Sequence, residues 1–505
     1  MTPEPLPDFE TFRRGWADGR PQVVVRRLVD DLETPVSAFL KVGHGRPYAV
    51  LLESVEGGAV NGRYSIVARD PDVVWRCRDG RAEIARGRDI DAGRFAMEET
   101  DALSSLRSLI AASRFDLPDG LPPMAAGLFG VFGYDMVRLL EPLGAPNPDP
   151  FDLPDAVLTR PSLVAIFDSV RHEIVLAAAV FPDGDEDVAA AWTAAVERLD
   201  RFEAELRAPL PPLPAPEFAP PPPFASPMEA AGFTALVDRA KDYIRAGDIF
   251  QVVLSHRSGA PWTGDPFAFY RSLRRSNPSP YLFFLDFGDF QLAGSSPEIL
   301  VRLKNGRVTI RPLAGTRPRG DTADADRALE AELLADPKER AEHLMLLDLG
   351  RNDVGRVAAP GSVEVTESFR IERYSSVMHI VSEVQGDARG DLDAVDALLA
   401  ALPAGTLSGA PKVRAMEIID ELESVKRGVG YGGGVGYISA GGEADICIVL
   451  RTALFAEGGI HIQAGAGVVS DSDPAAEYAE TLAKARAPIG AAADAWRYPC
   501  PKTAG

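Results

Sequence analysis

The sequence predicts an α+β fold built on antiparallel sheets. Short alternating or β-branched runs occur in groups, without the regular succession of strand and helix that a doubly wound sheet requires. Gly, Asp and Pro separate these runs, as they do between strands joined by turns. Hydrophobic residues make up 46% of the 505 residues, which is enough to bury a sizeable core.

Eight runs are predicted to be strands. They are Val23–Val25, Val164–Phe167, Ile174–Val180, Ile249–Ser255, Tyr281–Phe287, Val308–Arg311, Ala444–Phe455 and Gly459–Val469. A single strand over 444–455 would enclose Arg451, with Cys447, Val449 and Ala453 on the same face. A charge in a buried strand needs a partner, so an acidic side chain or an anionic ligand should lie beside it.

Helical periodicity marks several segments between the strands. Helices are predicted over Asp187–Leu206 and Met228–Ala246, from Pro411 onwards, through the run DPKERAEHLMLLDLG, and after Asp473, which would be an N-cap followed by Pro474. Two apolar stripes have helical spacing: Phe233, Leu236, Val237, Ala240, Tyr243 and Ile244 on one helix, and Ala415, Ile418, Ile419 and Leu422 on another.

A Pro-rich segment, PLPPLPAPEFAPPPPFASP, divides the chain, because it can form neither a helix nor a central strand. We therefore predict an N-terminal half (1–208), a linker (209–227), a C-terminal half (228–490) and a tail (491–505). The linker either separates two independent domains or crosses the surface of one intertwined fold. The residues themselves leave both arrangements open.

Net charge, targeting signals and cysteine content restrict the kinds of partner and metal site that we expect for this protein. The 53 basic and 74 acidic residues give a net charge of −21, which argues against nucleic acid or an anionic membrane as the main partner. No signal-peptide pattern and no apolar run long enough to span a bilayer occur, so we expect a cytoplasmic protein. Three scattered cysteines predict neither a disulfide framework nor a cysteine-based metal site.

Two glycine-rich segments have weak functional signals. Gly428, Gly430 and Gly433 satisfy a G-x-G-x-x-G pattern, but a helix precedes it and a strand follows, which is the reverse of a dinucleotide site. The segment 463–467 (QAGAG) would let backbone N–H groups approach an anion, and a tight bend of the sheet would explain it equally well.

Two pairs of carboxylates are more informative. Glu339 and Glu342 lie three residues apart on one predicted helix, and Glu477 and Glu480 do so on another. Each pair is either solvated helix surface or half of a site for a hard cation such as Mg²⁺. His379 lies in an apolar alternating run, where a buried structural histidine is the usual case.

Five segments together resemble the chorismate-utilising enzymes, and within them the subunits that make anthranilate. They are KERAEHLMLLDLGRND, YSSVMHIVSEV, GTLSGAPKVRAMEIID, DICIVLRTALF and QAGAGVVSDSDPAAEYAETLAKARA. The resemblance covers residues 20–490, and the tail AWRYPCPKTAG lies outside it. It implies two long intertwined halves with large antiparallel sheets flanked by helices, and chorismate bound in a cleft of the C-terminal half.

The resemblance also implies a site. Glu342 and Glu480 match direct Mg²⁺ ligands, and Glu339 and Glu477 match supporting carboxylates. The ion would join a dianionic substrate to an acidic protein. Residues that match substrate contacts are Gly315, Thr316, Tyr431, Arg451, Gly465, Ala466, Gly467 and Lys484.

Three further residues match the family's catalytic region. Glu298 is expected to protonate the departing 4-hydroxyl, and His379 to help move a proton during elimination of pyruvate. Thr406 matches a residue that lines the same cavity.

Two positions discriminate between members of the family. Aminodeoxychorismate synthases typically carry a nucleophilic Lys where this chain has Ala314. Isochorismate and salicylate synthases typically carry a Lys base where this chain has Gln251. Ammonia needs no such base, so both residues favour amination at C2. Those sister activities are the alternatives, and a tryptophan-sensing subunit without turnover is the alternative outside enzymes.

A regulatory site and a partner are implied as well. Residues 51–54 (LLES), 62–65 (GRYS) and 277–281 (NPSPY) resemble the segments that bind tryptophan. The expected contacts are Glu53, Ser54, Pro280, Tyr281 and Leu282, the last of which replaces a common Met and preserves its volume. Since no glutaminase signature occurs, ammonia would come from solution or from a separate glutamine amidotransferase subunit, in a heterodimer or heterotetramer.

Overall fold

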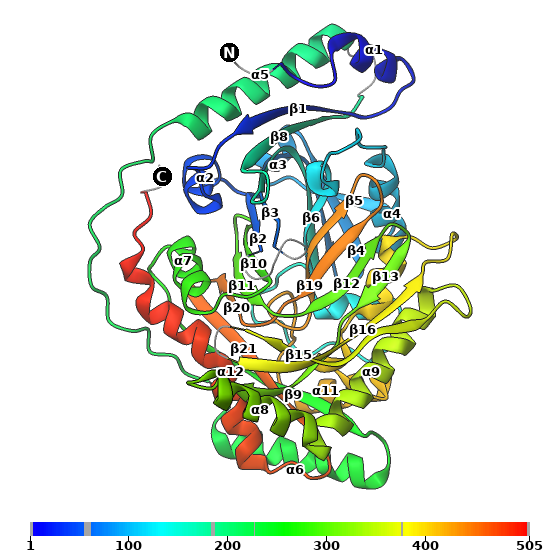
Figure 1. Ribbon diagram of the computed structural model, residues 1–505, viewed down its shortest axis with the longest axis vertical. Coiled ribbons are helices and arrows are strands. Elements are labelled where there is room, and N and C mark those ends of the chain that lie inside the picture. Colours follow the sequence, from blue (N-terminus) through cyan, green and yellow to red (C-terminus); the bar gives the residue numbers. More distant parts are fainter. Residues whose placement is uncertain (1–3, 55–61, 183–186, 227, 375–376, 502–505) are drawn as a thin grey trace.

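The computed structural model describes residues 4–54, 62–182, 187–226, 228–374 and 377–501 (Figure 1). Pro227 at the end of the predicted linker and residues 502–505 of the predicted tail lie outside these ranges. Hydrogen bonds link the described strands into one antiparallel network, flanked by helices. The predicted α+β class with antiparallel sheets is confirmed.

The strands before the Pro-rich segment are β1 (Gln22–Val29), β2 (Val50–Glu53), β3 (Tyr64–Arg78), β4 (Arg81–Arg86), β5 (Ala96–Asp101), β6 (Gly127–Phe132), β7 (Ala156–Asp168) and β8 (Glu173–Val180). After it come β9 (Gln251–Pro261), β10 (Tyr281–Asp286), β11 (Gln291–Ser296), β12 (Ile299–Lys304), β13 (Arg307–Ile310), β14 (Leu313–Pro318), β15 (Glu364–Arg373), β16 (Val377–Asp387), β17 (Gly409–Ala410), β18 (Gly434–Ser439), β19 (Ala444–Ile448), β20 (Thr452–Ala456) and β21 (Gly459–Val468).

The helices are α1 (Phe9–Ala17), α2 (Pro35–Val42), α3 (Arg88–Asp91), α4 (Ala102–Ala112), α5 (Val188–Arg207), α6 (Ala230–Ala246), α7 (Pro266–Ser276), α8 (Ala323–Ala335), α9 (Pro337–Val357), α10 (Ala394–Ala401), α11 (Lys412–Leu422) and α12 (Pro474–Asp494), with a short 3₁₀ turn, η3, at Gly405–Leu407. None of these combines the length and the apolar run needed to cross a bilayer.

The two halves are intertwined, because strands of one pair directly with strands of the other. β2 pairs with β10, and β6 pairs with β18. The Pro-rich segment runs along one side of the molecule from α5 to α6, mostly exposed, and its Phe218 contacts the ring of Trp496 (Figure 1). It is therefore a surface crossover within one fold, while the exact boundaries of the halves stay predictions.

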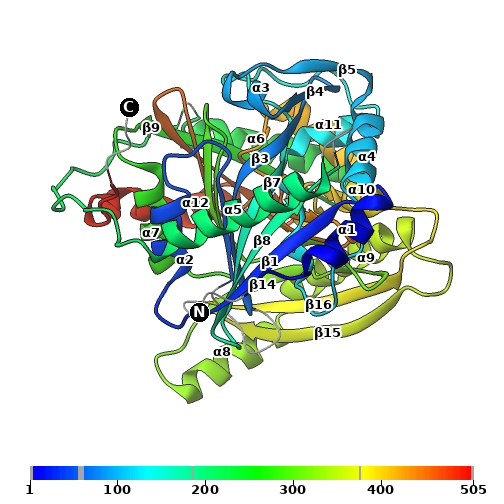
Figure 2. The same cartoon turned by 90° about the horizontal axis from the view of Figure 1, so that it is seen from above.

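Alternating side chains place the core on both faces of the strands. In β7, Leu163, Ala165 and Phe167 join a cluster covered by α1, α2, α5, α7 and α12, whereas Val164 and Ile166 join a second cluster formed mainly by strand residues. Figure 2 shows α5 lying across β1 and β8. A third cluster packs α4, α9 and α10 against other strands.

One predicted strand is wrong. The run 444–455 forms two strands, since β19 ends at Ile448 and β20 begins at Thr452. Arg451 lies in the break between them, with a left-handed backbone conformation (φ of 48°) that a regular strand does not contain.

The predicted helices agree closely with the structure. Helix α11 begins one residue after Pro411. Helix α6 begins at Ala230, two residues after the predicted start at Met228, and ends at Ala246 as predicted. The Asp473 carboxylate caps α12 by accepting the Ala476 N–H at 2.8 Å, and Pro474 is the first helical residue.

Candidate active site

Glu298 lies between β11 and β12, buried in the centre of the molecule. The Thr406 hydroxyl, on η3, donates to its Oε1 at 3.2 Å. Burial raises the pKa of the Glu298 carboxyl to about 8, even though Thr406, Arg451 and Lys484 each act to lower it. The carboxyl therefore holds a proton at neutral pH and can act as a general acid.

His379 on β16 lies opposite Thr316 on β14 and is also buried. Its Nδ1–H donates to the Gly315 carbonyl at 3.0 Å, with the Thr316 hydroxyl at the same distance. Burial lowers the pKa of His379 to about 4, so the ring is neutral. Its Nε2 is buried and has no hydrogen-bond partner among the residues that the structure describes, so its lone pair can accept a proton.

Two cations adjoin these groups. Arg451, at the break between β19 and β20, interacts electrostatically with Glu298, and burial lowers the pKa of its guanidinium. Lys484, on α12, donates to the Gly465 carbonyl at 3.0 Å. Both cations lower the pKa of Glu298 and of His379, so all four groups share one electrostatic environment.

Small residues on β21 make room for two larger side chains. β21 pairs with β9 in regular register through Gly465, Ala466 and Gly467, so the alternative of a tight sheet bend is wrong. A Cβ at Gly465 would lie 2.6 Å from the Tyr431 hydroxyl, and one at Gly467 would lie 2.8 Å from Gln251 Nε2. The glycines thus bring Tyr431 and Gln251 against the strand.

The four predicted carboxylates face one another from α9 and α12. Burial raises the pKa of Glu342, and the charges of Glu339, Glu477 and Glu480 raise it further. Lys338 lies 3.8 Å from Glu342, and Lys484 lies 2.7 Å from Glu480. Within the described residues, their oxygens do not converge to a cluster in which all ligand atoms lie within 4.8 Å.

Glu339 also reaches the substrate-contact region predicted at Gly315. Gly315 has φ of 69°, which favours glycine, and a Cβ there would lie 3.1 Å from Glu339 Oε2. Arg317 binds the same carboxylate at 3.0 Å. The strand that carries Thr316 therefore connects the carboxylates of α9 to His379.

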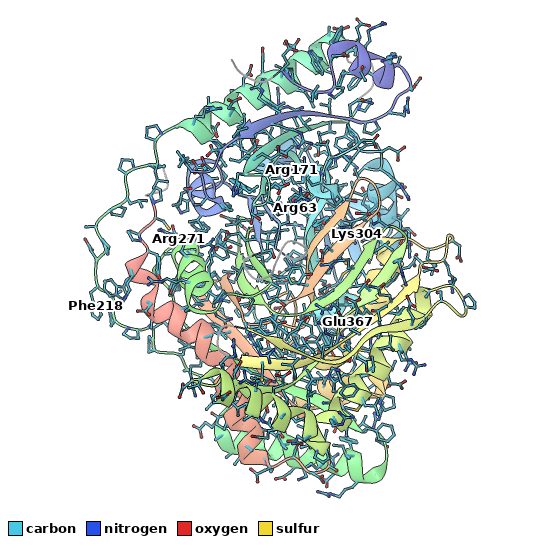
Figure 3. The ribbon with its side chains drawn as sticks, viewed as in Figure 1. Arg63, Arg171, Phe218, Arg271, Lys304 and Glu367 are labelled. Carbon is cyan, nitrogen blue, oxygen red and sulfur yellow. The ribbon has the colours of Figure 1, made fainter. Side chains whose placement is uncertain are left out.

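A cavity of about 970 Å³ lies between the two halves. All five residues predicted to contact tryptophan line it: Glu53, Ser54, Pro280, Tyr281 and Leu282. Glu298 lines it too, whereas Arg451 and Lys484 are not among its described lining residues. Figure 3 shows Arg63, Arg171 and Lys304, three cations of its wall, around the centre of the molecule.

The Glu53 carboxylate is already occupied by protein partners. It accepts hydrogen bonds from the Tyr270 hydroxyl and from Arg274, whose Nε lies 2.7 Å away. Both donors come from α7. A ligand in the cavity would therefore meet the backbone of Glu53 and not its charge.

Sequence reasoning missed the polar group that holds Tyr281. The Tyr281 hydroxyl donates to Asp445 at 3.1 Å and accepts from Arg302 at 2.9 Å. Arg302 and Asp445 lie on the adjacent strands β12 and β19, and both line the cavity. Only the strand register reveals this group, because no local motif joins these residues.

Comparisons with known proteins agree with this geometry. The family model of chorismate binding enzymes matches residues 64–490. The chain is 55% identical to anthranilate synthase component 1 of Cereibacter sphaeroides over 97% of its length and 98% of the relative's. It is 47% identical to the protein of the same name from Pseudomonas aeruginosa, over 96% and 98%.

Solved structures show the same fold. Anthranilate synthase component I from Streptococcus pneumoniae superposes with a TM-score of 0.73 at 36% identity, covering 92% of this chain and 98% of that one. The menaquinone-specific isochorismate synthase of Escherichia coli has a TM-score of 0.69 at 19% identity, over 96% and 98%, which is a likeness of fold alone.

Proposed function

This chain belongs to the chorismate-binding enzyme family, and on that premise we propose that it is the synthase subunit of an anthranilate synthase. It would convert chorismate and ammonia to anthranilate, pyruvate and water, at the start of tryptophan biosynthesis. The observation that most supports this proposal is that burial raises the pKa of one buried group and lowers the pKa of another. Glu298 keeps its proton at neutral pH while His379 is neutral with a free Nε2.

Each of the site residues has a separate role in the proposed reaction. Arg451 and Lys484 bind substrate carboxylates, the former with a planar guanidinium suited to two parallel hydrogen bonds. Glu298 donates its proton to the 4-hydroxyl as that group leaves and ammonia adds at C2. His379 Nε2 then accepts a proton from the ring as pyruvate is eliminated. Thr406 keeps the Glu298 carboxyl in place.

The donor set on α9 and α12 fits Mg²⁺, because it consists of carboxylate oxygens, which that ion prefers. Glu342 and Glu480 would hold the ion, with Glu339 and Glu477 in support. When bound, it polarises the ring carboxylate of chorismate. The mutual repulsion that raises the pKa of Glu342 would be relieved by a cation there.

Two residues support ammonia as the nucleophile. Ala314, on β14, has no atom that could attack C2, which disfavours an aminodeoxychorismate synthase. Gln251 is buried beside Gly467, and its Oε1 has no hydrogen-bond partner within the described parts of the chain. An amide does not act as a base for water, which disfavours an isochorismate or salicylate synthase.

The cavity between the halves supports feedback inhibition by L-tryptophan. A ligand bound across residues of both halves can favour one arrangement of them over another. Ammonia would come from glutamine through a separate amidotransferase subunit. All three cysteines are buried and burial raises the pKa of each thiol, so none resembles an activated glutaminase nucleophile.

Purified protein supplied with chorismate, MgCl₂ and ammonium chloride tests the activity through the fluorescence of anthranilate. Glu480→Gln should abolish Mg²⁺-dependent turnover while calorimetric tryptophan binding persists. Unchanged turnover would contradict the metal assignment. Tryptophan binding by the wild type without any turnover would instead favour a sensing subunit.

A further inference from the structure

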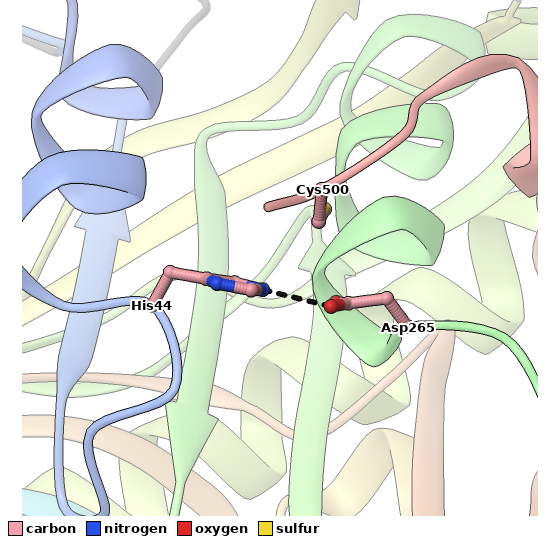
Figure 4. Close-up of side chains that lie close together, drawn as sticks. All are labelled: His44, Asp265 and Cys500. Atoms are coloured by element: carbon pink, nitrogen blue, oxygen red, sulfur yellow. Dashed lines mark hydrogen bonds and ion pairs between the residues drawn. The ribbon is translucent and has the colours of Figure 1, made fainter. Parts of the chain in front are cut away.

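Three side chains from distant parts of the chain meet outside the sites described so far. His44 follows α2, Asp265 is the N-cap of α7, and Cys500 lies in the C-terminal tail (Figure 4). Their candidate ligand atoms all lie within 4.8 Å of one another. Among the described residues, no other group of three or more His, Cys, Asp or Glu side chains is this compact.

The orientation of Asp265 leaves one oxygen for a ligand. Its Oδ1 accepts the Phe267 N–H at 2.7 Å, which caps α7, and its Oδ2 lies 2.7 Å from His44 Nε2. The helix N-terminus thus fixes the carboxylate with Oδ2 directed at the histidine. The side chain of Asp265 is 30% exposed and that of His44 is 7% exposed, so the group opens to solvent on the aspartate side.

The distances suit a tetrahedral ion after small movements. With bonds of about 2.0 Å to nitrogen and oxygen and about 2.3 Å to sulfur, ligand atoms around tetrahedral Zn²⁺ are about 3.3–3.5 Å apart. The His44–Asp265 pair would have to open by roughly half an ångström, and the Cys500 sulfur would have to approach by at most about 1.3 Å. Cys500 belongs to the tail, which is anchored to α7 by a hydrogen bond from Arg271 to the Pro499 carbonyl at 2.7 Å.

The charges favour a divalent cation. A thiolate and the Asp265 carboxylate with a neutral His44 would carry two negative charges, which Zn²⁺ neutralises. Asp286 interacts electrostatically with His44 and Asp265. Asp265 and Arg271 both lie within hydrogen-bonding reach of the Cys500 thiol, and the charge of Arg271 would offset part of the negative charge of the donor set. Without a metal, burial raises the pKa of the Cys500 thiol to about 12, so a bound ion would have to displace its proton.

We propose that His44, Asp265 and Cys500 form a zinc site, with water as the fourth ligand. A mixed sulfur, nitrogen and oxygen donor set suits Zn²⁺ and does not suit Mg²⁺. The ion would tie the C-terminal tail and the N-terminal half to the start of α7. The same helix also binds the Glu53 carboxylate, through Tyr270 in its middle and Arg274 in its last turn.

Co²⁺ substitution tests the site directly, since a cobalt–thiolate bond produces a near-ultraviolet charge-transfer band that an all-carboxylate site does not. The full chain, stripped of metal by a chelator, is titrated with CoCl₂ in excess MgCl₂ to fill oxygen-only sites. We expect one equivalent of Co²⁺ to generate the band, and one equivalent of ZnCl₂ to remove it.

Matched variants test whether Cys500 supplies the sulfur ligand. Cys500→Ala should lose the band and the bound equivalent of zinc, whereas Cys77→Ala, at another buried cysteine far from the site in sequence, should keep both. Asp265→Asn retains the helix cap and should weaken zinc binding at least tenfold. Absence of the band in the wild type, or a band that survives in Cys500→Ala, would overturn the proposal.

Discussion

Replacing Glu298 by Gln should make the protein more stable and nearly inactive. The carboxyl has a pKa near 8 in the folded protein and 4.5 as a model value, so the folded state binds more protons between these values. Rising pH therefore destabilises the wild type through this group. The difference of about 3.5 pH units, at about 1.4 kcal/mol per unit, amounts to roughly 5 kcal/mol at pH 8 and above.

Urea unfolding at pH 5 and at pH 8.5 measures this effect as the difference between variant and wild type. The free energy of unfolding of Glu298→Gln, relative to that of the wild type, should be several kcal/mol higher at pH 8.5 than at pH 5. Glu229→Gln is the matched control, because Glu229 is exposed and its side chain makes no capping hydrogen bond. Its difference from the wild type should not change with pH.

The activity of the same variant tests the proposed acid. Gln cannot donate the proton that the leaving hydroxyl needs, so kcat should fall by about 10²–10⁴-fold. Wild-type kcat should decline as pH rises through about 8, provided that free ammonia is held constant. A variant whose stability difference from the wild type is independent of pH, or which retains wild-type kcat, would refute the reasoning.

Three further predictions follow from single contacts. His379→Gln should abolish turnover. In urea unfolding, the wild type should lose about 2–3 kcal/mol of stability as pH falls from 6.5 to 4, because the buried His379 stays neutral and its protonation favours the unfolded state. The variant should not show this loss. Gly465→Ala should lower the stability measured by thermal unfolding by about 1–3 kcal/mol, because its Cβ would lie 2.6 Å from the Leu254 carbonyl oxygen. Gly467→Ala should lower the stability less, because its Cβ would meet only the end of the Gln251 side chain. Glutamine should support no anthranilate formation by the purified chain until an amidotransferase subunit is added, and activity with glutamine alone would contradict the proposed partnership.

Much of the local structure could be predicted from short-range rules. The cap at Asp473 and the apolar stripe of α11 follow from residue chemistry and helical spacing, and both are confirmed. The five cavity residues were identified by resemblance, since their grouping depends on the pairing of β2 with β10 across more than 200 residues of chain.

Other features depend on tertiary contacts that no local pattern reveals. β3 continues through Asp70, Pro71 and Asp72, although these residue types favour turns. Its pairing with β7 accommodates them in a bulge at which Asp70 has φ of 51°. The grouping of His44, Asp265 and Cys500 could not be predicted from three scattered cysteines, because the fold brings together residues that lie far apart in sequence.

Product identity tests the central claim most directly. Chorismate, MgCl₂ and ¹⁵N-labelled ammonium chloride are incubated with the purified chain, and the products are separated and identified by mass spectrometry. The account predicts anthranilate carrying one ¹⁵N, formed together with one equivalent of pyruvate. Isochorismate, salicylate or aminodeoxychorismate as the main product would contradict it.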